Sequence, residues 1–202
     1  MTRNMTRKTA WIVPLAAALV LFAACKDLKT PAQQALDSVT ATVNAVVETA
    51  TIYAPQDLAT LQNALTGLQQ SFGLKEYQKV IDQCPQVLGQ VDALKRTIEA
   101  RKSELGTAWS ALTSGLPGVV GAIQSRVDIL SQAKKLPAGM TPDMLASAQQ
   151  GLADMTAAWG AATAAANSGN LVDAVAQGDQ VKLMAGKVMS ALGMAVPPAL
   201  AN

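Results

Sequence analysis

The chain has 202 residues, with 16 basic and 14 acidic side chains, a formal net charge of +2 and no histidine. Without histidine, neither a Ser-His-Asp triad nor a Cys-His nucleophile can form, and the commonest ligand of transition metals is missing. Aromatic residues make up only 3% of the chain, which leaves few side chains on which nucleic-acid bases could stack. We therefore expect a protein that is not an enzyme, with no catalytic, cofactor-binding or metal-binding residues.

The N-terminal segment combines positive charge with a short apolar stretch. Residues 1–10 contain Arg3, Arg7 and Lys8 and no acid, and an apolar run follows from Trp11 to Ala24. A helix over that run would be about 21 Å long, which is short for a hydrocarbon core of about 30 Å. Basic residues followed by a short apolar run and small residues are typical of a secretory signal peptide, which we predict over residues 1–24.

The end of this segment, Phe22-Ala23-Ala24-Cys25, resembles the lipobox of bacterial lipoproteins. In that family the signal is cut just before the cysteine, whose thiol and new amine are then acylated. The resemblance implies that Cys25 is the first mature residue and the lipidation site, and that its acyl chains, palmitate among them, anchor the protein to a membrane. The sequence departs from the family pattern at Phe22, where leucine is usual. The alternative is a plain signal peptide or short membrane anchor with a coincidental cysteine.

The residues after Cys25 bear on localisation. In Gram-negative lipoproteins an aspartate directly after the cysteine favours retention in the inner membrane. Here that residue is Lys26, which favours the outer membrane if the host has two, with the protein facing the periplasm. We predict a lipidated cysteine and short tether over residues 25–30, at most about 17 Å long. That length keeps the start of the body close to the bilayer, which favours a partner in or near the membrane and excludes a long reach across the periplasm.

Removal of residues 1–24 changes the charge balance and the cysteine count. Residues 25–202 contain 13 basic and 14 acidic residues, so electrostatics give no support for nucleic-acid binding. With Cys25 assigned to lipid, Cys84 has no partner for an internal disulfide. It lies on an apolar helical stripe, so we expect it to pack in the core, with pairing to a partner chain as the alternative.

Apolar residues recur at spacings of three and four through the rest of the chain, which predicts an all-α domain of about six helices over residues 31–202. Thr30-Pro31 and Thr141-Pro142 have the pattern of helix starts, and Pro55 begins a further helix. A third helix is predicted from about Lys75 to Leu112, with a kink or break at Pro85. The cluster Ser114–Gly118 predicts a boundary, followed by a short fourth helix. The last helix is expected over residues 171–192.

Two segments of the chain match each other. PQDLATLQNALTGLQQSF, from Pro55, aligns without gaps with PDMLASAQQGLADMTAAW, from Pro142. After seven extra residues in the second copy, YQKVIDQCPQV aligns with LVDAVAQGDQV. We interpret this as two similar αα-hairpins, over residues 55–114 and 142–193. Over about 35 residues per copy they resemble tetratricopeptide hairpins, without the full set of that family's positions. The resemblance implies a protein-binding surface.

The remaining candidates for a binding site have ordinary structural explanations. A small basic cluster consists of Lys95, Arg96, Arg101 and Lys102. Asp92, Glu99 and Glu104 balance it, so we interpret it as a solvated helix face and not as a ligand site. Trp109 and Trp159 lie on apolar stripes, which favours core packing over a pocket lining. The GxxGxxG motif that starts at Gly115 lacks a preceding strand and predicts a turn.

Two functional hypotheses remain, from different classes. The first is a lipid-anchored, non-catalytic helical scaffold or adaptor that binds another protein of the cell envelope. The alternative is a small-molecule or lipid carrier with an apolar pocket between the helices, lined by the chain's methionines, which adapt to varied apolar ligands. The methionines that follow Cys25 are Met140, Met144, Met155, Met184, Met189 and Met194.

Overall fold

A computed structural model describes residues 27–200, and every regular element in that part is helical. The elements are α1 (Lys29–Asn44), α2 (Val47–Tyr53), α3 (Pro55–Gly73), α4 (Tyr77–Gln132), α5 (Pro142–Asn167), α6 (Leu171–Ala191) and the short 3-10 helix η1 (Pro198–Leu200). The predicted all-α class with six helices is confirmed. The division of the chain differs, because one expected helix is split into α1 and α2, and two expected helices are joined in α4.

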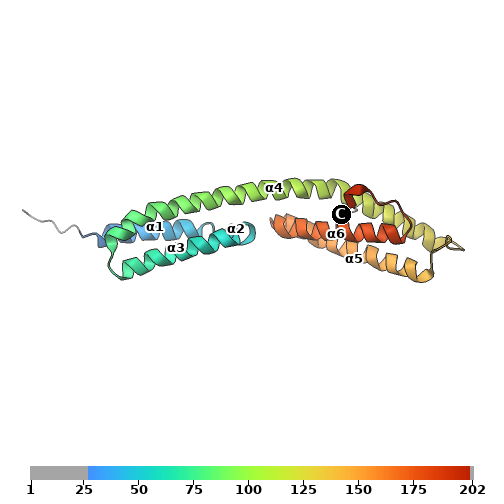
Figure 1. Cartoon of the computed structure of the whole chain (residues 1–202), viewed down its shortest axis with the longest axis horizontal. Coiled ribbons are helices and arrows are strands. Elements are labelled where there is room, and N and C mark those ends of the chain that lie inside the picture. The colour runs from blue at the N-terminus through green and yellow to red at the C-terminus, as the bar shows by residue number, and fades with distance from the viewer. Residues whose placement is uncertain (1–26, 201–202) are drawn as a thin grey trace, which may run out of the picture.

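The longest element, α4, has 56 residues and is therefore about 84 Å long. It arches along the whole molecule, and α1, α2, α3, α5 and α6 lie on its concave side (Figure 1). Its buried residues follow one another at intervals of three, four or seven, which keeps them on one face of the helix. They are Val80, Cys84, Val87, Val91, Leu94, Ile98, Leu105, Leu112, Leu116, Ile123, Val127 and Leu130.

The boundary predicted at Ser114–Gly118 is wrong, and so is the end of the first hairpin at residue 114, because α4 continues through both. Neither Pro85 nor Pro117 interrupts it. Glycine and proline weaken a helix by about 1 and 3 kcal/mol. Here the apolar stripe passes through the cluster, with Leu116 only 4% exposed, and burial against the neighbouring helices outweighs the local preference.

The helices form two bundles that share α4. The first bundle packs α1, α2 and α3 against the N-terminal half of α4, and the second packs α5 and α6 against its C-terminal half (Figure 1). Each bundle has its own hydrophobic core, the first centred on residues such as Val39, Leu61 and Val91, the second on Ile123 and Met155. Val175, near the start of α6, packs against both cores and joins them.

The internal sequence match corresponds to the second and third helices of each bundle. Pro55 and Pro142 both lie at the first turn of their helices, α3 and α5. The seven extra residues of the second copy lengthen α5, which has 26 residues where α3 has 19. In the second bundle the C-terminal half of α4 takes the place that α1 and α2 hold in the first. The repeated unit is therefore a three-helix bundle, of which the sequence match covers two helices.

The predicted helix starts are partly confirmed. The hydroxyl of Thr141 accepts a hydrogen bond from the Met144 N–H at 3.2 Å, as expected of an N-cap. Thr30, by contrast, caps nothing, because α1 begins at Lys29, whose N–H donates to the Asp27 carboxylate at 3.1 Å. The predicted tether over residues 25–30 is therefore two residues shorter at its C-terminal end. Its remaining part before residue 27, and the predicted signal peptide, lie outside the described residues.

Three helices end in the same hydrogen-bonded turn, in which the residue after the cap has a positive φ. At the ends of α5 and α6 this residue is glycine, with φ 84° at Gly169 and 65° at Gly193. At the end of α3 it is Lys75, with φ 63°, where the Glu76 N–H donates to the Ser71 carbonyl. Glycine is the residue that fits this left-handed conformation without steric cost. Lys75 is the one non-glycine residue with positive φ in residues 27–200.

Candidate interaction surfaces

The lipidation site predicted from the sequence, Cys25, lies outside the described residues. The other cysteine, Cys84, is 3% exposed on the inner face of α4, which confirms the core interpretation. Burial raises the pKa of its thiol, which lowers its fraction of reactive thiolate. Cys84 is thus a packing residue, and no surface chemistry follows from it.

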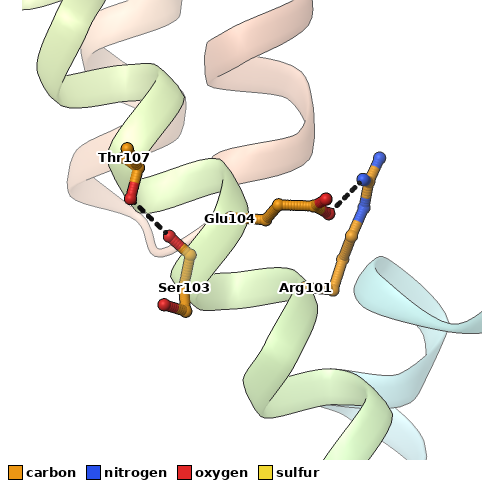
Figure 2. Close-up of polar contacts among 4 residues, drawn as sticks. All are labelled: Arg101, Ser103, Glu104 and Thr107. Atoms are coloured by element: carbon orange, nitrogen blue, oxygen red, sulfur yellow. Dashed lines mark hydrogen bonds and ion pairs between the residues drawn. The ribbon is translucent and has the colours of Figure 1, made fainter.

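The basic cluster on α4 is a solvated and locally neutralised helix face. Lys95, Arg101 and Lys102 pair with Asp92, Glu104 and Glu99, at 3.8, 2.9 and 3.5 Å. Figure 2 shows the pair between Arg101 and Glu104, together with the hydroxyl of Thr107 bonded to the Ser103 carbonyl one turn away. Such exposed pairs contribute little stability. Three of the four positive charges are paired with an acidic neighbour, which leaves only Arg96 without an ion pair among residues 27–200. One exposed guanidinium does not make a site for an anionic ligand.

The two tryptophans stack on each other, with ring centroids 5.3 Å apart and planes 21° from parallel. Both are half-buried and pack against the second core. The ring of Trp109 also approaches Gly178 of α6, where an added Cβ would lie 3.6 Å from it. Trp109 and Trp159 therefore fasten α4 to α5 and α6, as the core interpretation predicted.

The junction between the bundles depends on Tyr53, which sequence reasoning did not single out. Its hydroxyl donates to the carbonyl of Gly169, in the turn between α5 and α6, and accepts from the Leu171 N–H at 3.3 Å. The ammonium of Lys102 lies 5.4 Å from the centre of its ring. Tyr53 thus connects the end of α2 to the second bundle across 116 residues of sequence, and no local pattern reports such a pairing.

Replacing Tyr53 by phenylalanine should lower the free energy of unfolding by about 1–2 kcal/mol, because two backbone groups of the turn lose the hydroxyl of a buried tyrosine as their partner. Urea unfolding followed by circular dichroism measures this change.

Tyr77→Phe is the matched control for that variant. The Tyr77 hydroxyl makes no hydrogen bond to any of residues 27–200, so its removal should change stability by less than about 0.5 kcal/mol. Equal effects of the two variants would contradict the role given to the Tyr53 hydroxyl.

Several open grooves run between the helices of residues 27–200. One of about 390 Å³ lies where α4 crosses α6, with an apolar lining that includes Leu112, Leu116 and Leu200. A second, of about 500 Å³ between α3 and α4, has a lining rich in glutamine. A third, of about 670 Å³ between α4 and α5, mixes polar and apolar residues. No methionine lines any of these three grooves, while Met155 and Met189 fill the second core.

Large apolar side chains are exposed at both ends of the molecule. We call the end formed by residues 27–31 and 72–79 the proximal end, and the end formed by residues 129–145 the distal end. Leu74 is 72% exposed at the proximal end, whereas Ile129 and Met144 are 63% and 38% exposed at the distal end. Leu183, 49% exposed on α6, lies away from both ends. These ends and grooves are the surfaces available for interaction.

Within residues 27–200, no three acidic or cysteine side chains gather closely enough to bind a metal ion. None of the described helices is long and apolar enough to cross a bilayer. No known protein family, curated protein or solved structure matches the chain.

Proposed function

We propose that the protein is a lipid-anchored cell-envelope protein, acylated at Cys25, that acts as a non-catalytic helical scaffold or adaptor for another envelope protein. The observation that carries the proposal is the continuity of α4, which holds both bundles on one axis. An unbroken helix with bundles along its whole length is a stiff spacer, and the interaction surfaces just described lie at its ends and along its sides.

The length of the molecule bears on how far the protein extends from the membrane. The tether holds the proximal end near the bilayer, but α4 alone separates the two ends by about 80 Å. A short tether therefore does not by itself limit how far the protein extends from the membrane. The elongated body of residues 27–200, which we call the rod, extends much further than the tether. A partner can therefore lie either at the membrane or well away from it.

The proposal is tested by a mild-detergent pull-down of the tagged full-length protein from its own membranes, with intact-mass and peptide analysis. We expect an N-terminal peptide that begins at acylated Cys25, and one envelope protein in stoichiometric amount. A protein that purifies alone with its leader uncut would overturn both the anchor and the adaptor role.

A flexible 20-residue Gly/Ser linker inserted after Asp27 should lower the recovery of the partner by about tenfold. Such a linker has a root-mean-square length of about 25 Å, which dilutes the rod relative to a partner held at a fixed height above the membrane. Quantitative mass spectrometry of the pull-down measures the recovery. The same linker appended after Asn202 is the control and should leave recovery unchanged. If the insertion after Asp27 has no effect, position relative to the membrane is irrelevant to the adaptor.

The alternative function, a carrier of small apolar molecules or lipids, is favoured by one observation, the apolar groove between α4 and α6. Its occupant would lie beside Leu112 and Leu116, and not among methionines as the sequence suggested. Native mass spectrometry of the purified protein decides this point: a co-purifying ligand supports the carrier, and a clean apo mass removes its support.

A further inference from the structure

The turn between α3 and α4 has an unusual surface for a connection between two helices. Leu74 at its tip is the most exposed of the large apolar side chains among the described residues. Phe72 and Tyr77 flank it, both half-buried, with ring centroids 5.2 Å apart. An exposed aliphatic side chain close in sequence to an aromatic pair is typical of segments that enter the boundary layer of a bilayer.

The backbone of this turn is strained where the equivalent turns are not. Lys75 occupies the left-handed position that Gly169 and Gly193 occupy at the ends of α5 and α6. A glycine there would relieve the strain, so stability alone does not account for the lysine. Strained residues of this kind gather at functional positions. In this turn the strained residue is Lys75, which is exposed and directly follows the exposed Leu74.

The topology places this turn at the end of the molecule to which the predicted anchor is attached. Helix α3 runs antiparallel to α1 and α4. The start of α1 and the turn between α3 and α4 therefore lie at the same end of the molecule (Figure 1). Residue 27, where the described chain begins, is joined there to the segment that contains Cys25. If Cys25 is acylated, the turn lies within a few residues' reach of the bilayer.

We propose that the α3–α4 turn is a second membrane contact, in which Leu74 enters the bilayer interface while Lys75 and Lys29 bind lipid phosphates. The inference rests on the proposed lipid anchor and adds to it a defined orientation. One attachment point lets the rod pivot, whereas two at the same end hold its long axis away from the membrane plane. The distal end is then presented about 80 Å from the bilayer.

Charge and size favour a lipid surface over a protein as the occupant. Neither Lys29 nor Lys75 forms an ion pair with an acidic side chain in residues 27–200, whereas nearby Lys79 pairs with Glu76 at 2.8 Å. One protruding aliphatic side chain is far too small for a stable protein interface, which needs about 800 Å² on each partner. It suffices for a contact that the anchor has already brought to the membrane, because binding there is intramolecular.

The test uses the full-length protein in vesicles of phosphatidylethanolamine and phosphatidylglycerol. Cys84 is buried and Cys25 is acylated under the proposal, so an introduced cysteine is the thiol that a reagent reaches. An environment-sensitive fluorophore is attached in Leu74→Cys and, as the matched control, in Ile129→Cys at the distal end. Intact mass and vesicle flotation report the anchor separately, without the fluorophore.

We expect the fluorophore at position 74 to shift to the blue and to lose at least half of its emission to a nitroxide-labelled lipid. The fluorophore at position 129 should show neither effect. In a second experiment, a donor at position 129 should transfer little energy to headgroup acceptors. The double variant Leu74→Gln, Lys75→Glu should raise that transfer at least twofold, as the rod tilts.

The outcomes separate the two proposals. Acylated protein that floats with vesicles while position 74 stays in water overturns the second contact and leaves the anchor intact. Signals at both positions 74 and 129 also overturn it, because the rod then lies flat. A signal at position 129 alone identifies the distal end as the membrane-binding end. Protein that is not acylated and does not float overturns the anchor and the contact together.

Discussion

Replacing Ile123 by alanine should lower the free energy of unfolding by about 2–4 kcal/mol, the range for removing several methylene groups from a closed core. Ile123 is fully buried in the second core and follows Pro117 by less than two turns of α4. The loss depends on α4 running straight through Pro117, because only then does this residue face α5 and α6. Urea unfolding followed by helical circular dichroism measures the change.

The same helix supplies the control for that substitution. Ile129 is 63% exposed, and Ile129→Ala should change stability by less than about 0.5 kcal/mol. The two variants remove the same atoms from the same helix within two turns of each other. Similar losses at both positions would mean that the chain after Pro117 does not keep the register of α4.

Replacing Gly186 by alanine should lower stability by about 1.5–3 kcal/mol and release the C-terminal segment from α6. An added Cβ at this position would lie 2.7 Å from the backbone oxygen of Leu200, so η1 has to move. Leu200, now 8% exposed, would lose its burial against the second core. Hydrogen exchange of residues 194–200 should speed up in the variant, and urea unfolding gives the stability change.

Gly160→Ala is the matched control on α5. No atom lies within 4 Å of the Cβ that alanine would add there, so the substitution should raise stability by about 0.5–1 kcal/mol through helix propensity alone. Opposite signs at positions 160 and 186 are the expected result. A gain in both variants would show that the C-terminal segment does not rest on Gly186.

The spacing of apolar residues was sufficient to predict the helices and their buried faces. Val80, Cys84, Val87 and Val91 lie on the inner face of α4 as their spacing indicated. Thr141 caps α5, and Pro55 begins α3, because these residue types satisfy or tolerate the free N–H groups of a first turn. Such features depend on neighbours within four residues, which is the range over which sequence patterns report reliably.

The errors arose where distant packing overrides local preference. Ser114–Gly118 has the composition of a break, yet the spacing from Leu112 to Leu116 to Ile123 keeps one helical face, and α6 covers it. The junction at Tyr53 was missed because its hydrogen-bond partners lie more than 110 residues away. Lys75 was missed because lysine gives no signal for a left-handed residue.

The candidate sites divide in a similar way. Cys84, the two tryptophans and the basic face of α4 could be interpreted from their positions on helical stripes, and the structure places them accordingly. The exposure of Leu74 could not be predicted, since its neighbours Phe72 and Tyr77 are half-buried and only the turn geometry turns it outward. Acylation of Cys25 remains a prediction from the lipobox resemblance.

Sharing α4 between two bundles affects how the protein comes apart. Neither half can unfold without removing the helix on which its own core is built, and that helix continues as a wall of the other core. Val175 and the Tyr53 hydrogen bonds add further coupling at the junction. Bundles joined by a flexible linker would melt independently. Here unfolding of one bundle leaves the shared α4 with a frayed end inside the other bundle. Unfolding that starts at either end of the rod therefore destabilises the middle as well.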